Sequence, residues 1–243
     1  MHGKFFSSAK NSFWAIPALV VLTSAPVQAF SLTDSSVTGI TAADTNQSFT
    51  INFNGNVNST NIVGLSSTAV FTFLGFSANG SDTNAVFNIL LTNTSTSGIT
   101  SRTSALGFDT NPNVSAASST GLFNNAFVGA NLPNGFGSIE TCFNNGGNAC
   151  QGGGSGGVST GQPSGLFTTT LTFLGTVNTI DLSNFGVRYQ SISGTSLGNS
   201  GTGVGTPVPP NPVPAPPVAV GLWGIAALAA GAKAKKLLPA RKP

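Results

Sequence analysis

The chain has 243 residues, of which only 6% are charged, and it contains 31 glycines and 18 phenylalanines. This composition excludes a charge-rich helical protein and favours short strands joined by turns, in one domain with segments outside it. Although the formal net charge is +3, positions 30–205 hold two arginines against six acids, which gives 2 − 6 = −4. Nucleic acid is excluded as a partner, because its phosphates require clustered lysine or arginine.

Residues 1–29 have the pattern of a secretory signal peptide. Lysines at positions 4 and 10 precede an apolar run at 13–22, and small residues follow at the −3 and −1 positions of a cleavage site after Ala29. A retained membrane anchor is the alternative, but the run is short for a bilayer and is interrupted by Pro17. We expect signal peptidase to release a mature chain that begins at Phe30.

Residues 30–205 form a series of short runs in which apolar residues alternate with polar ones, bounded by Gly, Asn, Asp and Ser. A period of two is typical of strands with one buried face. The expected inward-facing sets are Phe49, Ile51 and Phe53; Ala69, Phe71 and Phe73; Ala85, Phe87, Ile89 and Leu91; Phe167, Leu171 and Phe173; and Phe185, Val187 and Tyr189. Because such strands must pack face to face, we predict an all-β fold, a single β-sandwich or jelly-roll-like domain.

Residues 206–243 divide into three parts. A spacer at 206–217, rich in proline, is expected to be extended. The uncharged segment 218–232 would form a helix about 22 Å long, short of the bilayer's hydrocarbon core of about 30 Å. The tail at 233–243 begins with three lysines that would stay on the cytoplasmic side, namely Lys233, Lys235 and Lys236. We expect the apolar segment to enter the membrane, transiently during export or as a permanent single-span anchor.

This three-part ending resembles the PEP-CTERM sorting signal of bacterial surface proteins. The resemblance rests on Pro214-Ala215-Pro216, on the apolar segment and on the lysines that follow. The family usually has Glu in the middle of this motif, and this chain departs from it with Ala215, as cyanobacterial-type tails often do. The resemblance implies that an exosortase, a membrane-embedded transpeptidase, cleaves the tail and passes the body to the cell exterior.

Three stretches of the body are similar to the cistern family of PEP-CTERM proteins: LGFDTNPNV at 106–114, NLPNGFGSIETCF at 131–143 and NFGVRYQSI at 184–192. The resemblance implies a secreted surface protein without an established activity. It offers no catalytic residues to carry over.

Cys142 and Cys150 are the two cysteines of the chain, and they flank the flexible sequence FNNGGNA. An even count in an exported protein predicts a disulfide that closes this small loop. A two-cysteine metal site is the alternative, but no histidine or third cysteine lies nearby to complete it. The following GGGSGG at 152–157 contains G-x-G-x-x-G, yet it lacks the flanking strand and helix of a dinucleotide site and is interpreted as a loop.

The triplet Asp-Thr-Asn occurs three times, beginning at Asp44, Asp82 and Asp109. Two interpretations stay open. Asx residues close turns by bonding their own backbone, and oxygen ligands two residues apart can also bind Ca²⁺ in secreted β-domains. If calcium binds, the expected ligands are Asp109, Asn111 and Asn113. No other metal or cofactor is expected.

Most catalytic chemistry lacks its residues in this chain. The single histidine is His2, which is lost with the signal peptide, and positions 30–205 contain no lysine. A carboxylate pair among Asp109, Glu140 and Asp181 is the remaining option, for a secreted hydrolase. We expect instead a non-enzymatic structural or adhesive component of the cell surface or extracellular matrix, with extracellular polysaccharide as a candidate partner. The alternatives are a Ca²⁺-dependent glycan-binding module and a permanently anchored ectodomain.

Overall fold

The computed structural model describes residues 30–146 and 149–209. The expected signal peptide, the hydrophobic segment 218–232, the basic tail and most of the spacer lie outside these residues. In the described part of the chain, no helix is long and apolar enough to span a membrane.

The described residues form fifteen strands and one short 3-10 helix. The elements up to the first long hairpin are β1 (Ser31–Leu32), β2 (Ser36–Thr41), η1 (Ala42–Asp44), β3 (Ser48–Phe53), β4 (Asn56–Val57), β5 (Thr60–Asn61), β6 (Ser67–Asn79) and β7 (Asp82–Asn93). The later strands are β8 (Thr100–Asn111), β9 (Ala116–Gly121), β10 (Asn125–Leu132), β11 (Gly137–Asn144), β12 (Val158–Ser159), β13 (Gly165–Phe173), β14 (Thr179–Ser193) and β15 (Ser200–Pro207). β15 therefore continues two residues into the segment that the sequence analysis assigns to the spacer.

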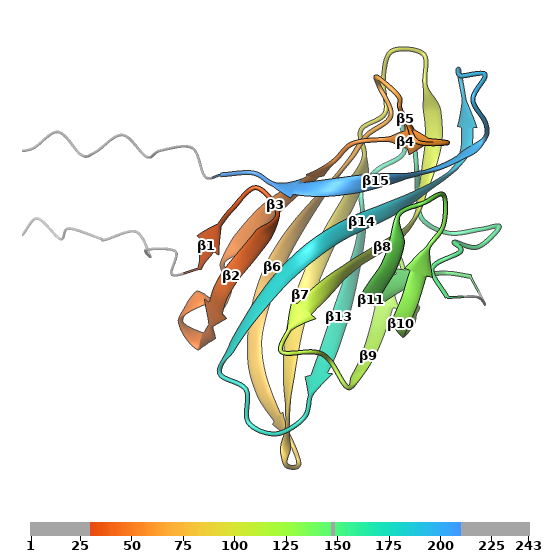
Figure 1. The fold of residues 1–243 in the computed structure, drawn as a ribbon. Helices are drawn as coiled ribbons and strands as arrows, with labels where there is room; N and C mark the ends of the chain where they lie inside the picture. Colours follow the sequence, from red (N-terminus) through yellow and green to blue (C-terminus); the bar gives the residue numbers. More distant parts are fainter. Residues whose placement is uncertain (1–29, 147–148, 210–243) are drawn as a thin grey trace, which may run out of the picture.

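The main strands join in the order β10-β11-β8-β14-β15-β3-β6-β7-β13-β9, and the pairs are antiparallel. β15 connects the two halves, because its first residues pair with β14 and its last residues pair with β3. The sheet folds over at this strand (Figure 1), and its end strands β9 and β10 come into contact. The predicted all-β fold is confirmed as an antiparallel sheet that is nearly closed.

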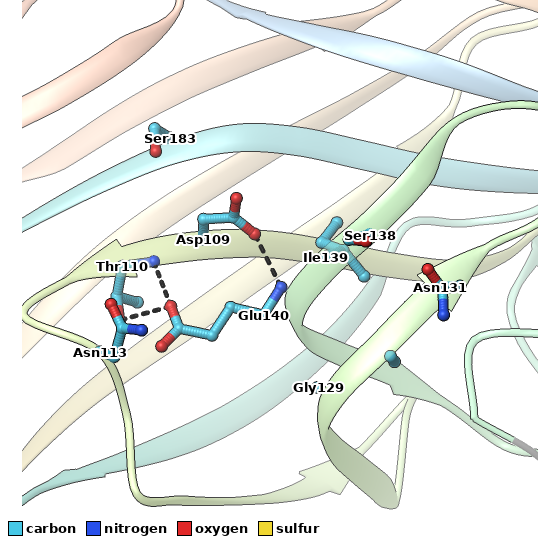
Figure 2. Close-up of a pocket in the computed structure, with 10 residues that line it drawn as sticks. Asp109, Thr110, Asn113, Gly129, Asn131, Ser138, Ile139, Glu140 and Ser183 are labelled. Carbon is cyan, nitrogen blue, oxygen red and sulfur yellow. Dashed lines mark hydrogen bonds between the residues drawn. The ribbon is translucent and has the colours of Figure 1, made fainter.

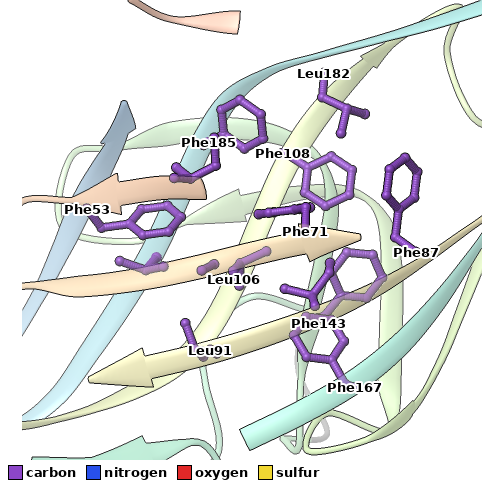
Figure 3. Close-up of a cluster of buried hydrophobic side chains, with 14 of the residues drawn as sticks. Phe53, Phe71, Phe87, Leu91, Leu106, Phe108, Phe143, Phe167, Leu182 and Phe185 are labelled. Carbon is purple, nitrogen blue, oxygen red and sulfur yellow. The ribbon is translucent and has the colours of Figure 1, made fainter. Parts of the chain in front are cut away.

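Phenylalanine is the most frequent residue of the core, and phenylalanines from the two halves of the sheet meet there (Figure 3). Phe71 of β6 contacts Phe108 of β8 and Phe185 of β14, with ring centroids 5.6 and 5.7 Å apart. Phe143 of β11 packs on Phe167 of β13 at 5.6 Å. All the inward-facing residues that alternation predicts are buried. Each buried phenylalanine stabilises the fold by about 1.5–3 kcal/mol.

A smaller apolar cluster lies on the opposite face of β8 and β14, where the hairpin of β10 and β11 packs against them. Two glycines make room for this hairpin. A Cβ atom on Gly186 would lie 2.5 Å from both Leu132 and Phe136, and one on Gly107 would lie 2.8 Å from Ile139. The hairpin therefore sits closer to these strands than any larger residue would allow.

Candidate functional site

A groove of about 570 Å³ opens where β8, β11 and β14 lie side by side (Figure 2). Its polar lining residues are Asp109, Thr110, Asn113, Asn131, Ser138, Glu140 and Ser183. The stretches 106–114 and 131–143 supply most of this lining, and β14 contributes Ser183. The order of the strands thus brings together stretches that are distant in the sequence.

Glu140 of β11 uses both carboxylate oxygens to bind the end of β8 and the turn after it. Oε2 accepts hydrogen bonds from the Thr110 backbone N–H at 2.6 Å and from the Thr110 hydroxyl at 2.8 Å. Oε1 accepts from the Val114 backbone N–H at 2.7 Å. These donors flank the cis Asn111-Pro112 peptide, so Glu140 holds both sides of this turn.

The other two candidate acids lie on the neighbouring strands and also bind N–H groups. Asp109 accepts the backbone N–H of Glu140 at 2.7 Å and the side-chain amide of Asn184 at 2.9 Å. Asp181 of β14 accepts the Gly39 N–H at 2.8 Å and the side-chain amide of Asn111 at 3.2 Å. The strand order places the three acids on neighbouring strands. Each carboxylate accepts a hydrogen bond from a backbone N–H of another segment and so links that segment to its own strand.

The candidate calcium ligands are only partly brought together. Asp109 and Asn113 line the groove, whereas Asn111 turns its amide to Asp181. In the described residues, no three His, Cys, Asp or Glu side chains are grouped so as to hold a metal ion. Calcium at this triplet stays a prediction.

The acids of the other two triplets also make hydrogen bonds to backbone. Asp44 accepts the Thr41 N–H at 2.9 Å in a capping box at η1, and Asp82 accepts the Gly175 N–H at 3.0 Å. Neither bond is the one to the backbone two residues on that the turn interpretation describes, because Asp44 accepts from an earlier residue and Asp82 from another loop.

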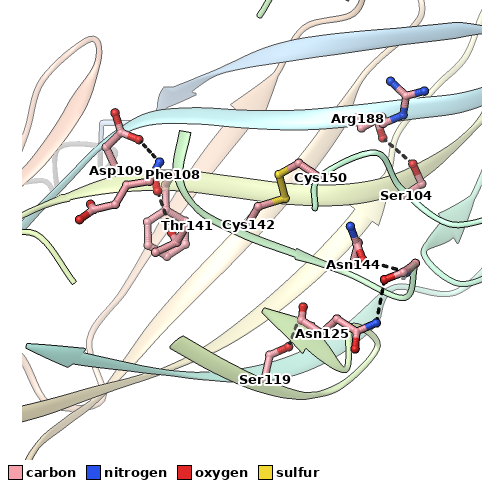
Figure 4. Close-up of a disulfide and its surroundings, with 12 residues drawn as sticks. Ser104, Phe108, Asp109, Ser119, Asn125, Thr141, Cys142, Asn144, Cys150 and Arg188 are labelled. Atoms are coloured by element: carbon pink, nitrogen blue, oxygen red, sulfur yellow. Dashed lines mark hydrogen bonds between the residues drawn. A yellow bond between two sulfur atoms is a disulfide. The ribbon is translucent and has the colours of Figure 1, made fainter. Parts of the chain in front are cut away.

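Cys142 and Cys150 form the predicted disulfide, with Cα atoms 5.7 Å apart (Figure 4). The glycine-rich loop that follows is held by Arg102 of β8. The guanidinium donates to the carbonyl oxygens of Gly153 at 2.6 Å and Gly156 at 2.6 Å, and to the side-chain oxygen of Gln190 at 2.8 Å. The sequence interpretation identified the loop and missed its clamp, because nothing local relates Arg102 to a segment fifty residues away.

A second candidate surface is the outer face of β3, β6, β7 and β13, here called the Thr/Asn face. It is defined by fifteen outward residues, all uncharged: Ser48, Thr50, Asn52, Thr68, Val70, Thr72, Asn84, Val86, Asn88, Leu90, Thr92, Leu166, Thr168, Thr170 and Thr172. The outward residues Leu74 of β6 and Asp82 of β7 lie outside this set, toward the turn that joins the two strands. Side-chain hydrogen bonds run across the strands, such as Ser48 to Thr72 at 2.8 Å and Thr168 to Asn88 at 2.7 Å. Between these rows Leu90 and Leu166 lie opposite each other, 39% and 53% exposed.

Comparisons with protein-family models, with curated proteins and with solved structures find no match for this chain. The groove, the Thr/Asn face and the pattern of the sequence are therefore the features that bear on function.

Proposed function

We propose that this protein is an exported structural or adhesive component of the cell surface or extracellular matrix, sorted by a PEP-CTERM-like tail. The Thr/Asn face is the observation that carries the adhesive role. It offers hydroxyl and amide groups in ordered rows across four strands, together with exposed leucines and no charge. Such a face suits an extended, neutral partner, because contact with it requires no desolvation of ions.

The hydrogen bonds along the rows also support this role. Thr72, Thr168 and Thr172 each pair with a side chain on the adjacent strand, so their rotamers are fixed before any partner arrives. A prearranged surface loses less side-chain entropy on binding than a mobile one. Extracellular polysaccharide, whose hydroxyl groups complement such rows, is the partner that this chemistry favours.

The test is retention of the protein at the surface of its native host. Leu166→Glu places a charge on the Thr/Asn face beside Leu90, and we expect the fraction held by washed cells or matrix to fall several-fold. Val63→Glu is the matched control, because Val63 is 81% exposed and lies outside this face. Equal retention of both variants and the unaltered protein would exclude the face as the adhesive surface.

The groove supports a second candidate, a Ca²⁺-dependent glycan-binding module. Its carboxylate, amide and hydroxyl side chains are the groups that bind sugar hydroxyls and calcium alike. We expect Ca²⁺ to raise the melting temperature and to promote sugar binding, both lost in Asp109→Asn. Calorimetry that detects no Ca²⁺ binding would remove this candidate.

A further inference from the structure

Arg188 of β14 is a buried cation with unpaired donors. Its side chain is on the face of β14 opposite the core residues Val187 and Tyr189. Even so, Arg188 is only 9% exposed. Its Nε and Nη1 atoms are buried and have no hydrogen-bond partner.

The neighbours of Arg188 supply no negative charge. Its partners on the adjacent strands are Ala105 of β8 and Thr202 of β15. The side-chain oxygen of Gln190, two residues along β14, already accepts from Arg102. Burial, and secondarily the positive charge of Arg102, lowers the pKa of Arg188, which is the direction expected of a cation without a counter-ion.

The acids of the groove are committed elsewhere. Asp109, Glu140 and Asp181 bind backbone N–H groups and asparagine amides, as described above. A guanidinium remains protonated at physiological pH, and a buried charge is unfavourable unless an opposite charge pairs with it. The missing element at Arg188 is therefore an anion from outside the domain.

We propose that Arg188 anchors a binding site for an oxyanion, namely a carboxylate or sulfate group of a ligand. The planar guanidinium donates along its edges to two oxygens of such a group. Thr202, directly across from Arg188, also lines a hollow of about 250 Å³ together with Asn134 and Phe136. Arg188 itself does not line this hollow, so the link between them is Thr202. A ligand that reaches the guanidinium past Thr202 would have an amide and an aromatic ring to contact.

The test is thermal unfolding of the full-length chain in detergent with sodium acetate or sodium sulfate, balanced with chloride to constant ionic strength. A bound anion raises the ratio of folded to unfolded protein by about 100-fold when its concentration is 100 times its Kd. We expect a saturable rise in melting temperature with acetate, sulfate or both. We expect Arg188→Met to abolish it, and Arg102→Lys to retain it because Arg102 binds carbonyl oxygens of the chain itself. No saturable rise, or an equal rise in Arg188→Met, would overturn the proposal.

A second measurement keeps the proposal testable if Arg188→Met does not fold. The chain has three arginines, so ¹⁵N-arginine labelling gives three Nε–H signals. The signal that is lost in Arg102→Lys belongs to Arg102, and slow exchange with solvent identifies the buried Nε–H of Arg188. We expect the signal of Arg188 to shift progressively with added acetate or sulfate while that of Arg102 changes little. An Arg188 Nε–H signal whose chemical shift stays constant throughout the acetate and sulfate titrations would contradict an oxyanion site at Arg188.

Discussion

Asp109 and Glu140 lie opposite each other on β8 and β11, and each carboxylate binds backbone of the opposite strand. Asp109 accepts the N–H of Glu140 at 2.7 Å, and Glu140 accepts the N–H of Thr110, next to Asp109, at 2.6 Å. The exchange adds two charge-assisted hydrogen bonds to the ladder between these strands. The two carboxylates in the groove therefore have a structural role, which is to link β8 to β11 and to hold the turn that follows β8.

Glu140→Ala should destabilise the protein by about 2 kcal/mol, because two backbone N–H groups lose a charged acceptor. Glu140→Gln retains one carbonyl oxygen and should cost about half as much. Urea unfolding measures both. Asp34→Ala is the control, since Asp34 is exposed in the turn between β1 and β2 and should change stability by less than about 0.5 kcal/mol. An Ala variant at position 140 as stable as this control would contradict the structural role.

Gly186→Ala should destabilise the fold by about 1–3 kcal/mol, because its Cβ would overlap Leu132 and Phe136 of the β10–β11 hairpin. Gly154→Ala is a matched control in the glycine-rich loop, where a Cβ meets nothing within 4 Å and the backbone is not in the left-handed region. The control should be neutral or slightly stabilising. Denaturant midpoints compare the two; equal midpoints would mean that the hairpin does not pack on Gly186.

Reducing the Cys142–Cys150 disulfide should lower the free energy of unfolding by about 2.5 kcal/mol on the loop-entropy model, given a sequence separation of 8 residues. Unfolding with and without dithiothreitol measures this loss. In the Cys142→Ser/Cys150→Ser double variant, dithiothreitol should have no effect. A loss that persists in the double variant would point to a cause other than this bridge.

The buried phenol of Tyr189 should make the free energy of unfolding decrease at alkaline pH. Burial raises the pKa of this phenol above its ordinary value of 10.0, and its hydroxyl donates to the Asn54 carbonyl at 3.1 Å. The raised pKa favours the neutral form in the folded state, so the contribution is complete below about pH 10 and is lost above it. The slope should be about 1.4 kcal/mol per pH unit, because only the unfolded chain releases the proton.

This tyrosine is the only one in the chain, so absorbance of the phenolate at alkaline pH reports on it alone. The phenolate signal should appear together with unfolding measured by circular dichroism, and Tyr189→Phe should remove the corresponding part of the pH dependence. Ionisation with an ordinary midpoint in a chain that remains folded would show that Tyr189 is not buried.

Alternation along the chain was enough to predict which residues face the core. Phe71, Phe87 and Phe185 each stand in a local period of two, and inward or outward direction is a local property of a strand. The burial of these residues confirms the prediction. The disulfide was likewise predictable, because the seven residues between the two cysteines leave them little distance to close.

Which strands become neighbours could not be predicted, and the groove depends on it. Asp109, Glu140 and Asp181 come from β8, β11 and β14, and β8 lies between the other two only in the folded sheet. Arg188 alternates with the core residues Val187 and Tyr189 and therefore lies on the opposite face of β14. It is buried on that face, and its neighbour Gly186 packs beneath a hairpin that is about fifty residues away in the sequence.

The most direct test of the proposed export and sorting is the intact mass of the protein from its native host, with peptide mapping of both ends. We predict a mature chain that begins at Phe30 and ends near Pro214-Ala215-Pro216. Recovery of 218–243 in the membrane fraction would instead make the protein a permanently anchored ectodomain. A chain that also retains residues 1–29 would contradict processing at both ends, and the proposed function with it.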